Sequence, residues 1–86
     1  MNPREVILYP LMTESTTRLI EKENKLVFVV NVKASKRDIA RAFEALYDAK
    51  ASDVNVHITH EGEKKAFIRL APEYNAADLA IKLGLL

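Results

Sequence analysis

Hydrophobic and polar residues alternate through residues 54–71, VNVHITHEGEKKAFIRLA, and this stretch organises the rest of the chain. The apolar positions are even-numbered on both sides of Gly62, which predicts two β-strands joined by a turn at that glycine. The even-numbered residues of both strands can face one core only if the connection between the strands has an odd number of residues or contains a bulge. We predict a three-residue connection, residues 61–63, that places His60 opposite Lys64; a two-residue turn with one bulged residue gives the same faces.

Two further strands precede this hairpin. Val6 to Tyr9 is a short apolar run closed by Pro10, and proline is confined to the edges of sheets, so the run is predicted to be an edge strand. Residues 25–33, KLVFVVNVK, are apolar on both faces at their centre, which is typical of a central strand covered on two sides. Val27 and Val29 make the second apolar face, and something must cover them.

Three helices are predicted from apolar residues at helical spacing and from N-cap residues. Thr13 caps a helix over about residues 14–22, and Ser35 caps a second over about residues 36–48, where Asp38 completes a capping box. Asn75 caps the last helix, which ends at Gly84.

The predicted order is strand, helix, strand, helix, strand, strand, helix. This interleaving of helices with mainly antiparallel strands indicates the α+β class, and the two apolar faces of the 25–33 strand indicate helices on both faces of the sheet. A split βαβ arrangement is the alternative in detail. With 86 residues, the chain makes a single domain, residues 1–86.

Composition narrows the class of protein. The chain has no Cys, so disulfides and thiolate metal sites are absent, and an intracellular compartment fits best. No ten consecutive residues are all apolar, so neither a membrane span nor a secretory signal is expected. The net charge of +1 argues neither for nor against nucleic acid. Residues 1–43 hold the excess of positive charge, mainly at Lys25, Lys33, Lys36, Arg37 and Arg41.

Catalysis has little support in the sequence. His57 and His60 are three apart in a strand and point to opposite faces, so they do not share a metal or a proton. Two glycines are too few for a phosphate-cradling loop, and the acidic residues form no recognisable pair. We therefore expect a non-enzymatic protein with no catalytic residue, no metal and no cofactor.

Nucleic-acid binding has more support. The odd-numbered face of the sheet gathers side chains that neutralise phosphates or bond 2′-hydroxyls and base edges, together with one aromatic ring that can stack on a base. This candidate group comprises Lys25, Asn31, Lys33, Asn55, Thr59, Lys65, Phe67 and Arg69. The alternative is a solvated sheet face with a half-buried Phe.

A second candidate phosphate site lies at the start of the 36–48 helix. Lys33, Lys36 and Arg37 stand close to the helix N-terminus, whose amide groups also attract anions. An ordinary charged first turn is the alternative.

Four segments together resemble one known family. They are PLMTEST at 10–16, NKLVFVV at 24–30, ASKRDIARAFEALYD at 34–48, and VNV at 54–56 followed by GEKKAFIRL at 62–70. In this order and spacing they closely resemble the universal large-subunit ribosomal protein of the L23 family, over nearly the whole chain. Each motif alone is weak, but their joint order is highly specific.

That resemblance implies an antiparallel four-stranded sheet with helices on both faces, in a protein of the cytoplasmic large ribosomal subunit. It implies binding to large-subunit rRNA at the rim of the peptide exit tunnel, beside the small helical protein of the L29 family. It also implies docking of nascent-chain factors, notably the signal recognition particle and, in bacteria, trigger factor. The matching motifs carry the RNA role to Asn24, Lys25, Ser35, Lys36, Asn55, Lys64, Lys65 and Arg69, and the factor-docking role to Glu14.

The hairpin departs from the bacterial pattern. Bacterial members have a long basic loop between the two strands that reaches into the tunnel, whereas here the connection is only residues 60–63. The short loop resembles the archaeal or eukaryotic core form.

We therefore expect a structural constituent of the large ribosomal subunit that binds rRNA and does not insert into a membrane. The alternative, from another class, is a non-ribosomal protein-interaction module that binds a peptide by strand addition at the Val6 edge.

Overall fold

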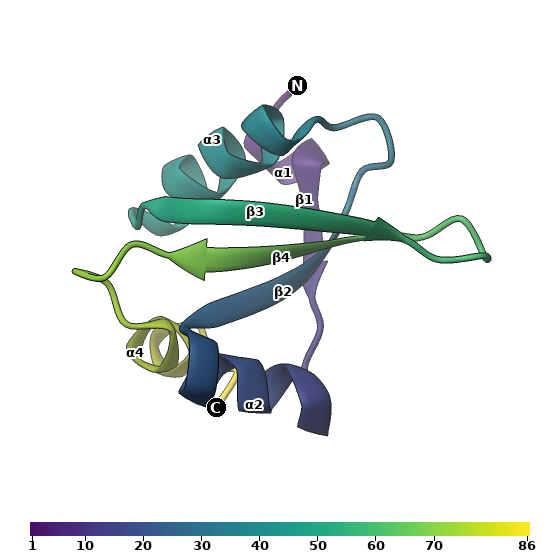
Figure 1. Ribbon diagram of the computed structural model, residues 1–86. Helices are drawn as coiled ribbons and strands as arrows, with labels where there is room; N and C mark the ends of the chain where they lie inside the picture. The colour runs from purple at the N-terminus through teal and green to yellow at the C-terminus, as the bar shows by residue number, and fades with distance from the viewer.

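The computed structural model describes residues 1–86, and its elements follow the predicted order with one addition (Figure 1). The addition is a short helix at the N-terminus, so the α+β class and the order of the other seven elements are confirmed. In chain order the elements are α1 (Pro3–Val6), β1 (Ile7–Pro10), α2 (Glu14–Glu23), β2 (Lys25–Val30), α3 (Lys36–Tyr47), β3 (Ala51–Ile58), β4 (Lys64–Leu70) and α4 (Ala76–Lys82).

The four strands form one sheet in the order β1-β2-β4-β3, and every neighbouring pair is antiparallel. β1 is therefore an edge strand, as its closing proline predicts, and β2 is central. In Figure 1, α1 and α3 lie above β3, and α2 and α4 lie below β2.

The two faces of the sheet are covered unequally. Even-numbered side chains such as Phe28 and Ile68 belong to one hydrophobic cluster, to which each of the four helices contributes. Val27 and Val29 are outside this cluster, yet they are only 3% and 4% exposed, so they are buried as predicted. On their face, Phe67 lies in register beside Val27, and Lys65 and Tyr9 lie beside Val29.

Three aromatic side chains join α3 to β2. The ring of Phe28 lies edge-on to Phe43, with centroids 5.9 Å apart, and stacks on Tyr47 at 5.6 Å. Phe28 and Phe43 are fully buried, and burial raises the pKa of Tyr47 above its usual value. Buried aromatic pairs in such geometries stabilise beyond the area they bury, so this contact fixes α3 against the sheet.

The predicted N-caps are confirmed. The hydroxyl of Thr13 accepts a hydrogen bond from the Thr16 amide at 3.2 Å, and that of Ser35 accepts from the Asp38 amide at 3.1 Å. The side chain of Asn75 likewise accepts from the Asp78 amide at 3.0 Å. Because caps are local interactions, the helices lie within one or two residues of their predicted bounds.

The hairpin differs from the prediction in its register. Ile58, not His60, pairs with Lys64, so even-numbered residues still share one face but the connection runs from Thr59 to Glu63. The Thr59 amide donates to the Glu63 carbonyl at 2.8 Å, and the Thr59 hydroxyl accepts from the Glu63 amide at 3.2 Å. These bonds close the loop earlier than predicted, with Gly62 at a φ of +87°.

Three predicted strand boundaries are wrong. β2 ends at Val30 rather than Lys33, because the side chain of Asn31 accepts from the Lys33 amide at 2.9 Å and turns the chain. The first strand starts at Ile7 rather than Val6, because Val6 is the last residue of α1, which begins with a capping box of Asn2 and Glu5. The sequence pattern Asn-Pro-x-Glu is a signal for such a helix start. β3 starts at Ala51, three residues before the predicted Val54.

Candidate nucleic-acid interface

The odd-numbered side chains of β2, β4 and β3 form three rows across the sheet. We call this surface the odd face, made of Lys25, Val27, Val29, Asp53, Asn55, His57, Lys65, Phe67 and Arg69. In register across the strands, the rows are Lys25, Arg69 and Asp53; Val27, Phe67 and Asn55; and Val29, Lys65 and His57. Side chains in register on one face stand about 5 Å apart, so Lys25, Asn55, Lys65, Phe67 and Arg69 are brought together.

Lys65 and Phe67 are the accessible centre of the odd face. Lys65 is partly exposed and takes part in none of the ion pairs of the protein, so its charge is free to meet an anion. Phe67 is half-buried beside Val27, with Asn55 exposed on its other side. A ring in this position can accept a stacked base, and the neighbouring amide can bond a 2′-hydroxyl.

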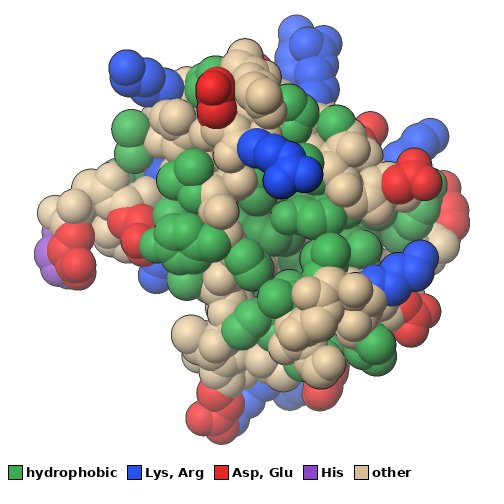
Figure 2. Space-filling view, turned by 180° about the vertical axis from the view of Figure 1, so that it is seen from behind, with side chains coloured by type: hydrophobic (Ala, Val, Ile, Leu, Met, Phe, Trp, Pro, Cys, Tyr) green, Lys and Arg blue, Asp and Glu red, His purple; other side chains and the backbone are tan.

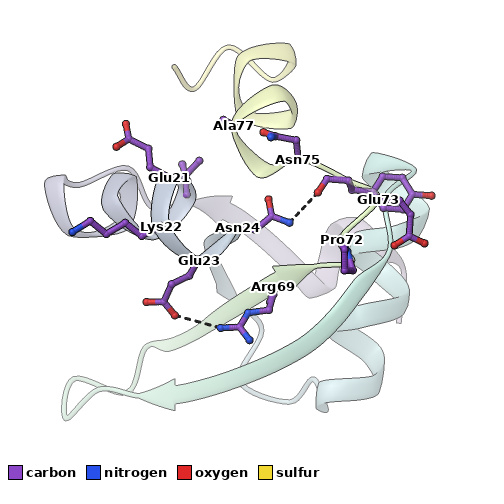
Figure 3. Close-up of a pocket in the computed structure, with 11 residues that line it drawn as sticks. Glu21, Lys22, Glu23, Asn24, Arg69, Pro72, Glu73, Asn75 and Ala77 are labelled. Carbon is purple, nitrogen blue, oxygen red and sulfur yellow. Dashed lines mark hydrogen bonds and ion pairs between the residues drawn. The ribbon is translucent and has the colours of Figure 1, made fainter.

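The other two cations of the odd face are paired with a carboxylate from α2. Glu23 places its Oε1 atom 3.1 Å from Lys25 Nζ and 3.4 Å from Arg69 Nη2, and Figure 3 shows the bond to Arg69. The hydrogen bond and charge of Lys25 are the main causes that lower the pKa of Glu23, so the carboxylate is ionised at neutral pH. Asp53 adds a second acidic group in register with Arg69.

Sequence patterns did not reveal either acidic group. Nothing in the periodicity connects Glu23 with a residue of β4, since the two are far apart in the chain. Asp53 precedes the predicted strand, and only the earlier start of β3 brings it onto the odd face.

Asn24, predicted to bind RNA, is engaged inside the protein. Its φ of +54° ends α2 and turns the chain into β2. Its Nδ2 donates to the carbonyls of Leu70 at 3.3 Å and Tyr74 at 2.9 Å, and its Oδ1 accepts from the Ala76 amide at 2.7 Å. Figure 3 shows this side chain between α2 and the start of α4. Both amide donors are therefore used within the fold.

Lys64 and Ser35 are engaged in the same way. Lys64 Nζ donates to the Ala34 carbonyl at 2.6 Å, and its even position directs it away from the odd face. Ser35 caps α3, and its amide donates to the Asp38 carboxylate at 3.0 Å. The structure thus separates both residues from Lys65 and gives them structural roles.

The start of α3 forms a second group of cations. Lys33, Lys36 and Arg37 are exposed there, as predicted, whereas Lys33 and Asn31 lie beyond the end of β2 and so do not belong to the odd face. Lys36 and Arg37 line a cavity with Asp53 and its neighbours at the start of β3. Asp53 therefore lies where this group meets the odd face.

Asp38 already places a carboxylate at the start of α3. The hydrogen bonds from the amide and the hydroxyl of Ser35 lower the pKa of Asp38, which keeps it ionised at neutral pH. An anion approaching Lys36 and Arg37 therefore also meets the negative charge of Asp38.

Glu14, the predicted factor-docking residue, opens α2. It is exposed and forms an ion pair with Arg18 one turn later, with 3.1 Å between the charged atoms. Exposed pairs of this kind contribute little to stability, so Glu14 is available to a partner.

The side of the molecule seen in Figure 2 is of mixed character. Figure 2, seen from behind Figure 1, shows hydrophobic side chains gathered across the middle of that side. Lys and Arg side chains there are spread among Asp and Glu rather than collected.

Two other kinds of site are not found. No group of three or more His, Cys, Asp or Glu side chains is arranged to hold a metal ion. No helix combines the length and the apolar character that spanning a membrane requires.

Comparisons with known proteins place these features in a family. The sequence profile of the family described as ribosomal protein L23 matches residues 5–77. The chain is 48% identical over 85 residues to proteins named large ribosomal subunit protein uL23 from three strains of Methanococcus maripaludis, with 99% of this chain and 99% of each relative covered. The chain therefore belongs to the ribosomal protein L23 family, as its four sequence segments indicate.

Proposed function

We propose that this chain binds large-subunit rRNA through the odd face and the basic start of α3. Membership of the L23 family makes it a structural, non-enzymatic protein of the large ribosomal subunit, which works in the cytoplasmic ribosome. The observation that carries the choice of surface is the grouping of Lys25, Lys65 and Arg69 on one sheet face with Phe67 and Asn55.

The sheet explains how such a surface can recognise folded RNA. Its strands hold the cations at fixed spacings, and RNA is recognised largely by the shape and phosphate positions of its fold. Lys65 supplies a phosphate contact directly, Phe67 a stacking surface and Asn55 a hydrogen-bonding group. Lys36 and Arg37 extend the positive surface past the β3 edge.

At a finer level, the protein stands at the rim of the peptide exit tunnel beside a protein of the L29 family. Glu14 belongs there to a docking site for nascent-chain factors such as the signal recognition particle. The resemblance of the PLMTEST segment and the exposure of Glu14 support this placement. The loop from Thr59 to Glu63 is short, so we propose no tunnel-lining role for it.

One observation favours a second candidate, peptide binding by strand addition. β1 is an edge strand, and its Leu8 and Tyr9 side chains are about half exposed. Edge strands of this kind accept an extended peptide through main-chain hydrogen bonds. A protein that acted this way would be recovered with protein partners and without rRNA.

Co-sedimentation with crosslinking tests the proposal. A photo-crosslinking residue at position 65 should join the protein to rRNA in purified large subunits, whereas the same residue at position 82, on α4, should not. Absence of the protein from large subunits would contradict the proposal, and so would crosslinks from position 65 to proteins alone.

A further inference from the structure

We infer that Glu23 is an internal counter-ion that weakens RNA binding at Lys25 and Arg69, an inference that rests on the proposed RNA-binding function. A single oxygen, Glu23 Oε1, lies 3.1 Å from Lys25 Nζ and 3.4 Å from Arg69 Nη2. The carboxylate thus contacts both cations, as a phosphate oxygen bound by both would, and Figure 3 shows its bond to Arg69.

The backbone around this group fixes the three side chains in place. Lys25 pairs in register with Arg69, so the two cations are neighbours on the odd face. The Leu70 amide donates to the Asn24 carbonyl at 3.0 Å, and Asn24 Nδ2 donates back to the Leu70 carbonyl at 3.3 Å. Glu23 precedes Asn24 and Arg69 precedes Leu70, so these bonds hold the carboxylate beside the guanidinium.

The consequence is that the odd face carries two kinds of cation. Lys65 has no acidic partner, so a phosphate gains its full attraction. At Lys25 and Arg69, a phosphate must displace Glu23 or approach against its charge. The side chains of Glu23 and Arg69 are 43% and 46% exposed, and an ion pair at such exposure is weak enough to be exchanged. Lys25 is only 15% exposed, so its pair with Glu23 is the harder one to displace.

This arrangement favours RNA whose fold delivers a phosphate to that point. An RNA that contacts only Lys65 leaves the ion pairs of Glu23 intact, so Lys25 and Arg69 add nothing to its affinity. Glu23 therefore acts as a specificity-determining residue, which lowers the affinity for RNA in general and leaves two cations for the RNA that displaces it.

The test compares Glu23→Gln with Glu21→Gln. Both substitutions remove one negative charge from α2, but Glu21 takes part in no ion pair. Affinity of the full chain for deproteinised large-subunit rRNA is measured over a range of salt concentrations, and thermal melting checks that each variant is folded. We expect Glu23→Gln to bind roughly threefold to tenfold more tightly than Glu21→Gln at low salt, and its affinity to fall more steeply with salt.

A second comparison locates the effect. In a protein that already carries Lys25→Gln and Arg69→Gln, adding Glu23→Gln should give little gain, because both cations that Glu23 masks are then absent. The inference is overturned by a Glu23→Gln affinity equal to or below that of Glu21→Gln, or by a gain of the same size in the protein that carries Lys25→Gln and Arg69→Gln. Failure of the wild-type chain to bind rRNA is a separate result, which removes the proposed function and this inference with it.

Discussion

Asn24 and Leu70 hold each other through two hydrogen bonds, one from the Leu70 amide to the Asn24 carbonyl at 3.0 Å and one from Asn24 Nδ2 to the Leu70 carbonyl at 3.3 Å. The same side chain bonds Tyr74 and Ala76, so one residue joins α2, β4 and the start of α4. This joint sets Glu23 beside Arg69 and therefore shapes one end of the odd face.

Asn24→Ala should lower the free energy of unfolding by about 2–3 kcal/mol, because three side-chain hydrogen bonds are lost and alanine is disfavoured at positive φ. Urea denaturation measures the change. Asn24→Gly is the control, since glycine keeps the left-handed backbone, and its loss should be smaller. The folded Asn24→Ala protein should bind rRNA no more weakly than the wild type; a loss of affinity without a loss of stability would show that Asn24 contacts RNA.

Lys64 and Lys65 offer a matched pair of adjacent lysines with different roles. Lys64→Met should destabilise the protein by about 1 kcal/mol, because the bond to the Ala34 carbonyl is lost. Lys65→Met should change stability by less than about 0.5 kcal/mol and weaken rRNA binding. Equal effects of the two substitutions on both stability and affinity would contradict the separation of roles.

Ser35→Ala should cost about 1 kcal/mol, because the N-cap of α3 is lost. Ser15→Ala is the matched control, since Ser15 lies exposed within α2 and caps no helix. Thermal melting of the two variants gives the comparison. A Ser35→Ala protein as stable as Ser15→Ala would mean that the capping box does not stabilise α3.

Asp38 should make stability depend on pH in the acid range. Its pKa is lowered in the folded protein, mainly by the hydrogen bond from the Ser35 amide, so the ionised form favours folding. The contribution is fully present above the usual aspartate pKa of about 3.9 and is lost as pH falls through the lower folded value. Unfolding measured against pH should therefore show a gap between wild type and Asp38→Asn that narrows below about pH 4. A gap that stays constant down to pH 2 would contradict this.

The elements of the fold could be predicted because their signals are local. N-caps at Thr13, Ser35 and Asn75 and the periodicity of the helices depend on residues within one or two turns. The alternation in residues 54–71 likewise determined which side chains share the odd face, even though the pairing was displaced by two residues. A shift of two residues leaves every side chain on the same face of the sheet. The register itself depends on the hydrogen bonds of Thr59 in the loop.

The details of the site could not be predicted because its contacts join distant parts of the chain. A lysine in the sequence does not reveal whether its amine is free, as at Lys65, or bound to a distant carbonyl, as at Lys64. The pairing of Glu23 with Arg69 requires α2 and β4 to be placed in space. Alternation in the sequence thus indicated which residues share the odd face, and the structure shows which of its cations are paired with a carboxylate and which are not.

The most direct measurement is the salt dependence of rRNA binding by a double variant of the odd face. Lys65→Glu with Arg69→Glu is compared with Lys22→Glu and Lys82→Glu, which change the same charges at exposed positions on α2 and α4. We expect the odd-face variant to bind more weakly and its logarithmic salt slope to fall by about 1.5, as the loss of two phosphate contacts requires. The control should keep an affinity and slope near those of the wild type. An odd-face variant that binds like the wild type, or a control that loses as much, would contradict RNA binding through the odd face.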